Sequence, residues 1–424
     1  MNICLVGVNH RTAPVAIREK AIVRSGQVND ALRLLCPLVP HSIILSTCNR
    51  TEVYTTPDDD SCARAASLDF LQSHLETTDT TLLKHTYTLE GEAAVEHLFR
   101  TASGLDSMVV GEYEVLGQVR RALRMAEKAK MVNLPLRHIF QGSIRTGRRV
   151  REETGISKNA LSASSVAVDL AAKVIGKLGS CKMLVIGAGE AGKLAARAAS
   201  DRGISRIVVA SRTQERASSL TDLLGGIPIS VNSVVEELNT CNIIITCADA
   251  PHYILDVSQV KAAMRQRPEL PLVIIDIAVP RNVDPAVAQV ENVFLYNIDD
   301  LSQVLEKNRR QRGGEVKKVE KIISDELAKF ATWWQEFKVR PVLRALMSKA
   351  EEIRRSQLER TIKKLPPLSD EDKYSLEMMT KAIITKILKN PIQNIKANGR
   401  SNRDYDEYAE MVKELFQLKE ESCR

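Results

Sequence analysis

The stretch MLVIGAGEAG at residues 183–192 decides the fold of the central part of this chain. An apolar run leads into three glycines spaced as GxGxxG, and the alanine-rich stretch KLAARAAS (193–200) follows. This order of strand, glycine loop and helix is typical of a dinucleotide-binding unit, because glycines permit a tight turn and let backbone N–H groups approach a pyrophosphate. The alternative is a loop whose glycines serve the turn alone. The predicted cofactor-binding residues here are Gly187, Ala188, Gly189, Glu190, Ala191 and Gly192.

Strand-like and helix-like segments alternate on the carboxyl-terminal side of this loop. The apolar runs are RIVVAS (206–211), NIIITCA (242–248), PLVIIDIA (271–278) and VFLYN (293–297). Such alternation produces a doubly wound parallel sheet with helices on both faces. We therefore predict a Rossmann-type NADP-binding domain over residues 151–300.

The end of the second predicted strand indicates which nicotinamide cofactor is bound. Ser211, Arg212 and Thr213 lie about 20 residues beyond the last glycine, where a site for NADH carries an acidic residue for the ribose hydroxyls. An arginine between two hydroxyls suits a 2′-phosphate instead, so the sequence favours NADPH as the cofactor. A merely solvated Arg212 is the alternative.

Residues 1 to about 110 alternate short apolar runs, ICLVGV (3–8) and SIILST (42–47), with helical stretches at 27–36 and 61–75. This pattern predicts an N-terminal α+β domain. Residues 115–150 are helix-like and basic, and their length suggests a connecting helix that starts within this domain and leads to the next.

The last segment, residues 301–424, differs in composition from the rest. It holds 27 Lys and Arg against 20 Asp and Glu, which accounts for the whole net charge of +7. Its apolar residues recur at spacings of three and four, which predicts amphipathic helices interrupted at Pro366-Pro367 and Pro391. Helices with such apolar stripes bury them against a partner, and we expect that partner to be a second copy of the chain. The positions in question are Val316, Val319, Ile323, Phe330, Trp333, Phe337, Leu376, Met379, Ile383 and Ile387.

Composition excludes several classes of protein. A chain of 424 residues with 44% hydrophobic and 27% charged residues is long enough for several globular domains. Its apolar runs are far shorter than the about 20 residues of a membrane span, and the start MNICLVGVNH lacks the features of a secretory signal. We expect a cytoplasmic protein whose eight cysteines are reduced thiols, with no metal site, because no ligand cluster has convincing spacing.

One cysteine has a position that suits catalysis. Cys48 lies at the end of the apolar run SIILST and is followed by Asn49 and Arg50. A thiol at a strand exit beside an arginine can be partly exposed and biased toward the thiolate that attacks carbonyls. An inert buried cysteine is the alternative, because free cysteines are among the residues most often buried.

Several motifs in a fixed order resemble the glutamyl-tRNA reductase family. They are GVNHRTAPVAIREK (7–20), STCNRTEVY (46–54), EHLFRTASGLDSMVVGEYEVLGQVR (96–120), GRRVREETGIS (147–157), VIGAGEAG (185–192) and IDIAVPRNVDP (275–285). The resemblance implies a multidomain α/β protein with an N-terminal catalytic domain, a long spinal helix, a Rossmann-type NADPH domain and an all-helical dimerisation domain. The corresponding ranges are 1–150, 151–300 and 301–424, with the connecting helix starting in the first.

The resemblance also implies an activity and its partners. Family members reduce glutamyl-tRNA(Glu) with NADPH to glutamate 1-semialdehyde and release the tRNA, the first step toward 5-aminolevulinate and tetrapyrroles. The implied partners are glutamyl-tRNA(Glu), a second subunit in a homodimer and, as a candidate, the aminomutase that consumes the aldehyde. Without the resemblance, an NADP dehydrogenase for a small free substrate and a non-enzymatic tRNA-binding protein would remain open.

By the same resemblance, Cys48 is the nucleophile that holds glutamate as a thioester, and His97 assists proton transfer. Periodicity alone would favour a packed or capping role for His97 on its predicted helix. Further residues match substrate-binding positions of the family, namely Thr47, Arg50, Ser107 and Glu112. Gly104 is expected to meet a backbone requirement. His10, Arg11 and Thr12 match a family signature to which the sequence assigns no separate roles.

Overall fold

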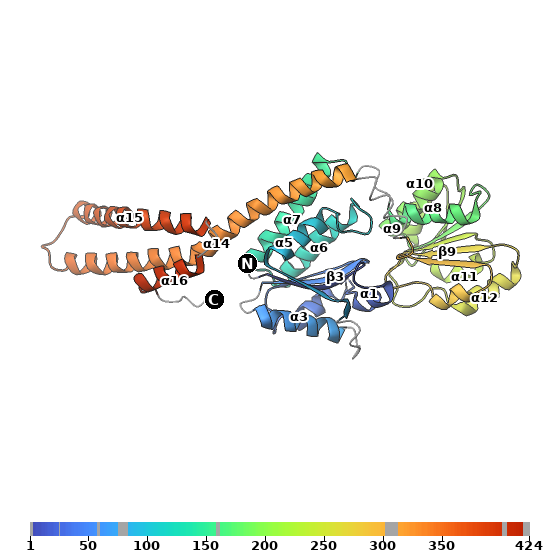
Figure 1. Cartoon of the computed structure of the whole chain (residues 1–424), viewed down its shortest axis with the longest axis horizontal. Coiled ribbons are helices and arrows are strands. Elements are labelled where there is room, and N and C mark those ends of the chain that lie inside the picture. The colour runs from blue at the N-terminus through green and yellow to red at the C-terminus, as the bar shows by residue number, and fades with distance from the viewer. Residues whose placement is uncertain are drawn as a thin grey trace. The chain divides into compact units, whose positions relative to one another are not determined.

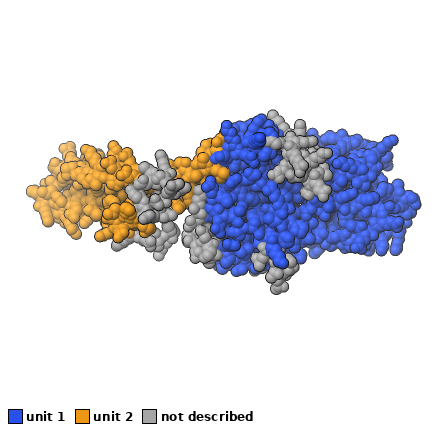
Figure 2. Space-filling model, in the orientation of Figure 1, with its two compact units in different colours: residues 1–324 blue, residues 325–424 orange. Residues whose placement is uncertain are grey.

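The computed structural model describes residues 3–24, 26–56, 60–74, 84–157, 162–301, 313–400 and 405–418. The chain divides into two compact units, Met1–Ser324 and Asp325–Arg424 (Figure 2). The first unit contains two β-sheets with their helices, and the described part of the second is helical. The predicted multidomain α/β architecture is confirmed. The domain boundaries near residues 150 and 300 stay predictions.

An antiparallel four-stranded sheet forms the amino-terminal part of the first unit, in the order β2-β3-β1-β4. Its strands are β1 (Cys4–Asn9), β2 (Ser42–Ser46), β3 (Arg50–Thr55) and β4 (Tyr87–Glu90). Helices α5 to α7 lie on one side of this sheet and α3 lies on the other (Figure 1). The helices are α1 (Val15–Ala21), α2 (Val28–Leu35), α3 (Asp60–His74), α5 (Gly91–Ala102), α6 (Glu114–Lys128) and α7 (Leu134–Glu153).

The expected connecting helix across residues 115–150 is wrong in position. This segment forms α6 and α7, whose apolar faces are buried beside the four-stranded sheet. The ring of Phe140 on α7 packs edge-on against Tyr54 of β3, with 5.2 Å between centroids. The long helix of this chain is α14 (Gly313–Ile362), which comes after the second sheet.

A six-stranded parallel sheet follows, in the order β10-β9-β8-β5-β6-β7. Counted from β5, this is the strand order 3-2-1-4-5-6 of a Rossmann fold, read from the opposite edge. The strands are β5 (Lys182–Ile186), β6 (Arg206–Ser211), β7 (Ile227–Ser230), β8 (Ile243–Thr246), β9 (Leu272–Asp276) and β10 (Val293–Asn297). The connecting helices are α8 (Ala163–Ile175), α9 (Glu190–Asp201), α10 (Gln214–Leu224), α11 (Val234–Glu237) and α12 (Val257–Gln266), with 3₁₀ turns η1 (Val231–Ser233) and η2 (Pro285–Gln289). The predicted fold of this segment is confirmed.

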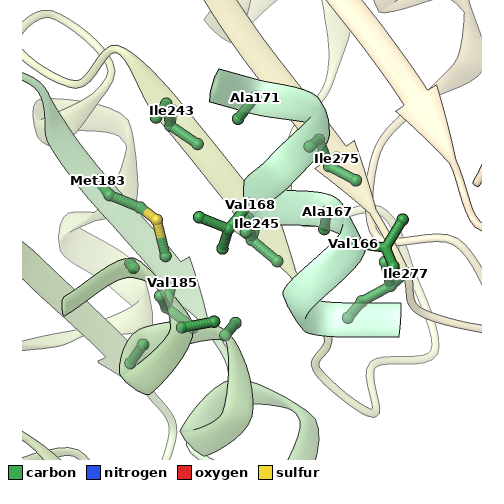
Figure 3. Packing of buried hydrophobic residues seen from close by; sticks show 14 of the residues in the cluster. Val166, Ala167, Val168, Ala171, Met183, Val185, Ile243, Ile245, Ile275 and Ile277 are labelled. Atoms are coloured by element: carbon green, nitrogen blue, oxygen red, sulfur yellow. The ribbon is translucent and has the colours of Figure 1, made fainter. Parts of the chain in front are cut away.

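Alternate residues of the central strands enter two different cores. On one face, Met183, Val185 and Ile245 pack with Val168 and Ala171 of α8 (Figure 3). Their sequence neighbours point to the other face and pack there with α11 and α12. Both faces of a parallel sheet are covered by helices, which explains why these strands are apolar at every position.

The second unit consists of the later part of α14 together with α15 (Asp370–Arg400) and α16 (Tyr405–Leu415). Pro366-Pro367 lie between α14 and α15, as predicted. Pro391, expected to interrupt a helix, instead lies inside α15. The buried side chains of this unit form a small apolar core that includes Val339, Val342, Leu346, Leu388, Ile395, Ala409 and Val412. Among the described residues, each helix is too polar or too short to cross a membrane.

Candidate active site

Cys48 lies in a tight turn between β2 and β3. The Thr47 hydroxyl accepts hydrogen bonds from the backbone N–H groups of Asn49 (3.1 Å) and Arg50 (3.2 Å), and Thr47 N–H donates to the Arg50 carbonyl (2.8 Å). Short polar side chains commonly shape turns in this way. In this structure Thr47 therefore fixes the path of the chain around the thiol.

The Cys48 thiol is held in its protonated form. Burial raises its pKa to about 12. The carboxylates of Glu112 and Glu114 add to this effect, because their negative charges disfavour formation of a thiolate. Arg18 opposes the shift and donates a hydrogen bond to the Cys48 carbonyl oxygen (2.9 Å). The expectation that Arg50 biases the thiol toward thiolate is wrong, because the Arg50 side chain is engaged elsewhere.

Arg50 lies in a buried polar network behind the thiol turn. Its side chain is 2% exposed, and Nη1 donates to Glu52 (2.6 Å) and to the Thr101 hydroxyl (3.0 Å). Nη2 donates to the Asp106 carbonyl oxygen (2.6 Å). A buried arginine requires this number of acceptors to offset its lost hydration. Binding of a substrate carboxylate by Arg50 stays a prediction.

Glu52, which the sequence reasoning missed, is the centre of this network. It is fully buried and accepts hydrogen bonds of 2.6 Å from Arg50, Tyr54 and Tyr87. Burial alone would raise the pKa of Glu52, but Arg50 and His97 together with the Tyr54 hydroxyl hold it below its ordinary value. A carboxylate directly before Val53 and Tyr54 in the strand RTEVYT was the available signal.

His97 of α5 contacts the same carboxylate. Its Nε2 lies 2.9 Å from Glu52 Oε1, and its Nδ1 lies 3.8 Å from Asp106 Oδ2. Because a carboxylate only accepts hydrogen bonds, we assign a proton to Nε2. The side chain is 12% exposed, so the structure places His97 at the margin of the buried network and next to Arg50.

Two glycines shape the loop between α5 and α6. Gly104 and Gly111 have φ of +78° and +85°, and Gly111 N–H donates to the Gly104 carbonyl (3.0 Å). The expected backbone requirement at Gly104 is confirmed, because residues with a side chain rarely adopt this left-handed backbone conformation. Ser107 and Glu112 lie on this loop, and their side chains interact.

Glu112 is poised to exchange a proton near neutral pH. Burial raises its pKa to about 7, while the Ser107 side chain works in the opposite direction. Its carboxylate helps to raise the pKa of the Cys48 thiol, so the two groups interact electrostatically. Arg151 of α7 donates to the Glu112 carbonyl oxygen (2.7 Å), which fixes the backbone at this position.

The signature of residues 9–12 lies beside the thiol turn. His10 N–H donates to the Asn49 carbonyl (2.9 Å), and burial together with Arg50 and Arg11 lowers the pKa of His10 to about 3. Thr12 closes a turn with Asn9, and Arg11 pairs with Asp106 at 3.3 Å. In the described part of the chain, His10 Nδ1 and Asn49 Oδ1 are buried without a hydrogen-bond partner, which marks them as polar groups free for a ligand.

The three glycines of the nucleotide loop have three different surroundings. A Cβ on Gly187, which has φ of +117°, would lie 2.9 Å from Ala248 N, and one on Gly192 would lie 1.8 Å from the Gly187 carbonyl oxygen. A Cβ on Gly189 would meet no atom within 4 Å. The outer two therefore permit the turn and close helix packing, whereas Gly189 leaves space at the amino terminus of α9 for a pyrophosphate. The residues present fit a dinucleotide.

The end of β6 carries the residues predicted to select the cofactor. Arg212 is exposed and its Nη2 donates to the Asp249 carbonyl oxygen (2.8 Å), so its guanidinium lies across the carboxyl ends of β6 and β8. The Ser211 hydroxyl accepts from Thr213 N–H (3.2 Å). Contact of these three residues with a 2′-phosphate stays a prediction.

The thiol and the nucleotide loop border the same apolar core. Cys48 packs against a core cluster that includes Ala188, and Ala191 packs against the same cluster. Glu114, at the start of α6, interacts electrostatically with both Cys48 and Glu190.

The fold and the site define the class of this protein as an oxidoreductase. A dehydrogenase-type parallel sheet for a nicotinamide cofactor follows an amino-terminal domain that carries the Cys48 turn. Comparison with protein families assigns each part. Residues 6–154 match "Glutamyl-tRNAGlu reductase, N-terminal domain", residues 169–304 match "Shikimate / quinate 5-dehydrogenase", and residues 318–418 match "Glutamyl-tRNAGlu reductase, dimerisation domain".

Similar proteins cover the chain almost completely. Glutamyl-tRNA reductase of Natranaerobius thermophilus is 38% identical over 99% of this chain and 93% of its own length. That of Syntrophobacter fumaroxidans is 40% identical over 98% and 91%. The solved structure of glutamyl-tRNA reductase from Methanopyrus kandleri is 33% identical, with a TM-score of 0.52 over 98% of this chain and 99% of that one. This chain belongs to the glutamyl-tRNA reductase family.

Proposed function

We propose that this protein reduces glutamyl-tRNA(Glu) with NADPH to glutamate 1-semialdehyde and free tRNA, as the first step of tetrapyrrole synthesis. The single observation that supports the chemistry most strongly is the packing of the Cys48 turn against the cluster that holds the nucleotide loop. A small-molecule dehydrogenase would have no use for this thiol, and a tRNA-binding scaffold would have no use for the open space at Gly189.

The first step is acyl transfer to the thiol. The Cys48 sulfur attacks the ester carbonyl of glutamyl-tRNA, the bond from carbon to the ribose oxygen breaks, and the thiol proton ends on the released ribose hydroxyl. The product is a thioester on Cys48 and free tRNA. Because a sulfur atom donates weakly into a carbonyl, the thioester is the better hydride acceptor.

The thiol needs a base, because its pKa is raised to about 12. His97 is the base predicted from the family resemblance, and its Nδ1 is the basic nitrogen when Nε2–H is bound to Glu52. Glu112 is the second candidate, because its carboxyl interacts electrostatically with the thiol and its pKa of about 7 makes it partly ionised at neutral pH. We favour Glu112 for the thiol proton and a substrate-orienting role for His97.

The second step is reduction of the thioester. NADPH supplies a hydride to the carbonyl carbon when it is bound. The backbone N–H groups after Gly189 and the amino terminus of α9 would hold the pyrophosphate, and Arg212 with Ser211 and Thr213 would hold the 2′-phosphate. The bond from carbon to sulfur then breaks, the aldehyde leaves, and Cys48 regains a proton from its neighbours.

One experiment tests the proposed function. The full-length protein is mixed with glutamyl-tRNA(Glu) without NADPH, quenched, and mapped by mass spectrometry. We expect a glutamyl adduct on Cys48. When NADPH is added afterwards, one equivalent of NADPH should be oxidised for each adduct that disappears. Free glutamate and uncharged tRNA(Glu) serve as controls and should give neither. Reduction at an ordinary rate by Cys48→Ala would contradict the thioester mechanism.

The helical second unit is proposed to form the homodimer. Met379, Ile383 and Ile387 lie at intervals of four on α15 and are 52%, 49% and 66% exposed. Such a stripe is typical of a face that pairs with another chain. Light scattering at micromolar concentration should give twice the mass of 47.1 kDa, and Ile383→Glu should shift the protein toward the monomer.

A cytoplasmic location and transfer of the aldehyde to an aminomutase complete the proposal. An amino aldehyde is reactive in water, so direct transfer to the next enzyme would limit its loss. Pull-down of the aminomutase by the homodimer, compared with a Cys48→Ala homodimer that makes no aldehyde, tests whether association needs turnover. Absence of the aminomutase from both samples would remove it from the list of partners.

A further inference from the structure

Helix α1 links the thiol turn to the six-stranded sheet. Arg18 Nη2 pairs with Asp299, which follows β10, and Val15 N–H donates to Asp299 Oδ2 (2.7 Å). Asp299 itself is held in a turn, because its N–H donates to the Asn297 side chain (2.8 Å). The amino-terminal end of α1 is therefore fixed to one edge of the six-stranded sheet.

A second ion pair joins α1 to the loop that follows β9, the strand beside β10. Glu19 accepts three hydrogen bonds from Arg281, from its backbone N–H (3.2 Å), Nε (2.9 Å) and Nη2 (2.5 Å). The loop that bears Arg281 is rigid, because Asn282 and Val283 donate backbone N–H bonds of 2.7 and 2.9 Å to Asp276 at the end of β9. Glu19 and Arg281 are 15% and 18% exposed, so water screens this bidentate pair only weakly.

The Arg18 side chain contacts both the thiol turn and the residue after β10. While Nη2 pairs with Asp299, Nη1 donates to the carbonyl oxygen of Cys48 (2.9 Å). The Arg18 side chain is 2% exposed, and burial lowers its pKa although Asp299 opposes that shift. A buried guanidinium must keep its acceptors, so the carbonyl of Cys48 and the carboxylate of Asp299 are tied through one rigid planar group.

We propose that α1 is a positioning element that couples docking of the nucleotide-binding sheet to the placement of the Cys48 acyl group, with Arg18 as the positioning residue and the pair of Glu19 and Arg281 as the clamp. This inference rests on the proposed thioester reaction. Arg18 and Glu19 act through the backbone of Cys48 and through the docked sheet, and neither takes part in bond making.

The proposal separates the two steps of the reaction. Acyl transfer uses groups around the thiol turn, so it does not need the clamp between Glu19 and Arg281. Hydride transfer needs the thioester and the nucleotide loop at a fixed separation, and misplacement by about 1 Å can cost on the order of a hundredfold in rate. Loss of the clamp should therefore slow reduction and leave thioester formation nearly unchanged.

The experiment is a charge swap in the full-length protein. Glu19→Arg and Arg281→Glu each place two like charges at the clamp, and the double variant restores an ion pair of opposite polarity. In single turnovers, each single variant should oxidise NADPH at least about tenfold more slowly, and the double variant should recover to within about threefold of the original rate. Thioester formation should stay within about twofold in all three. Arg202→Glu, which disrupts a pair with Asp169 inside the nucleotide-binding part, is the control and should not slow reduction.

A substrate-free measurement keeps this inference separate from the proposed function. Hydrogen–deuterium exchange of peptides covering residues 15–21 reports on docking, because Val15 N–H is bonded to Asp299. Exchange should rise in each single variant and return in the double variant. Failure of the original protein to acylate Cys48 would refute the proposed function while leaving this measurement valid. The inference is overturned if the double variant remains as slow or as exposed to exchange as the singles, or if the singles lose thioester formation and reduction together.

Discussion

Gly7 of β1 lies directly opposite Glu52 of β3, and a methyl group on Gly7 would lie 2.8 Å from Glu52 Cγ. The missing side chain at Gly7 provides the space in which the buried carboxylate is held. Because Glu52 in turn binds Arg50 and His97, a glycine on an adjacent strand determines where two candidate active-site residues lie.

Replacement of Gly7 by alanine should press on Glu52 and destabilise the four-stranded sheet. Overpacking of this kind costs about 1–3 kcal/mol, so the free energy of unfolding should fall by this amount and kcat should fall with it. Gly117→Ala on α6 is the matched control, because a methyl group there meets nothing within 4 Å and a helical alanine adds up to about 1 kcal/mol of stability. Urea denaturation of the two variants in parallel gives the comparison, and equal stabilities would contradict the role of Gly7.

The pH dependence of thioester formation should report on Glu112. With a folded pKa of about 7, its carboxyl is mostly neutral at pH 6 and mostly ionised at pH 8, so a base role predicts a rate that rises through pH 7. Glu112→Gln should lose this rise and about a hundredfold in rate. Rapid-quench measurement of the Cys48 adduct from pH 5.5 to 8.5 tests this. If the rise persists in Glu112→Gln but disappears in His97→Asn, then His97 is the base.

The two roles of the glycine loop, cofactor binding at Gly189 and close helix packing at Gly192, should separate by mutation. Gly189→Asp has space for its side chain but brings a carboxylate to the pyrophosphate position, so NADPH binding and reduction should fail while Cys48 still forms its thioester. Gly192→Ala should destabilise the fold, because its Cβ would lie 1.8 Å from the Gly187 carbonyl oxygen. Circular dichroism melting and NADPH titration of both variants distinguish these outcomes. A folded Gly189→Asp with unchanged NADPH affinity would exclude the proposed cofactor position.

Arg212 should control the preference for NADPH. Arg212→Glu replaces a favourable phosphate contact by repulsion, and a charge-assisted contact is worth about 1.5–3 kcal/mol, so the ratio of kcat/KM for NADPH to that for NADH should fall about tenfold to a hundredfold. Arg206→Glu at the opposite end of β6 is the control, since its Nη2 donates to the Ser180 carbonyl. An unchanged ratio in Arg212→Glu would leave the 2′-phosphate without its proposed partner.

Local patterns predicted much of this architecture. The apolar runs around 183–192 and their alternation with helices identified the parallel sheet, because short-range periodicity and glycine spacing express local geometry. The position of Cys48 at a strand exit followed in the same way. The expected connector failed at residues 115–150, since an amphipathic pattern shows that a face is buried but not which surface buries it.

The features of the site that the sequence did not predict depend on contacts between residues far apart in the chain. Arg18 and Asp299 are 281 residues apart in sequence, and Asp299 lies outside the motifs that resemble the family. The protonation of Cys48 and of Glu112 depends on burial by several elements at once, which no local stretch encodes. Arg50 follows Cys48 by two residues, but its guanidinium pairs with Glu52. Proximity in sequence therefore predicted a lowered pKa for the thiol, whereas the structure raises it.

The high pKa of Cys48 has a consequence for survival under oxidative stress. Peroxides react with thiolates, and a thiol with a pKa of about 12 presents almost none at neutral pH. With no substrate bound, hydrogen peroxide should convert the Cys48 peptide to sulfenic acid more slowly in the original protein than in Glu112→Gln/Glu114→Gln, in which two carboxylates that raise this pKa are gone. Mass spectrometry of timed samples measures the difference. A resting reductase of this kind stores its nucleophile in a form that oxidants leave intact until an aminoacyl ester arrives.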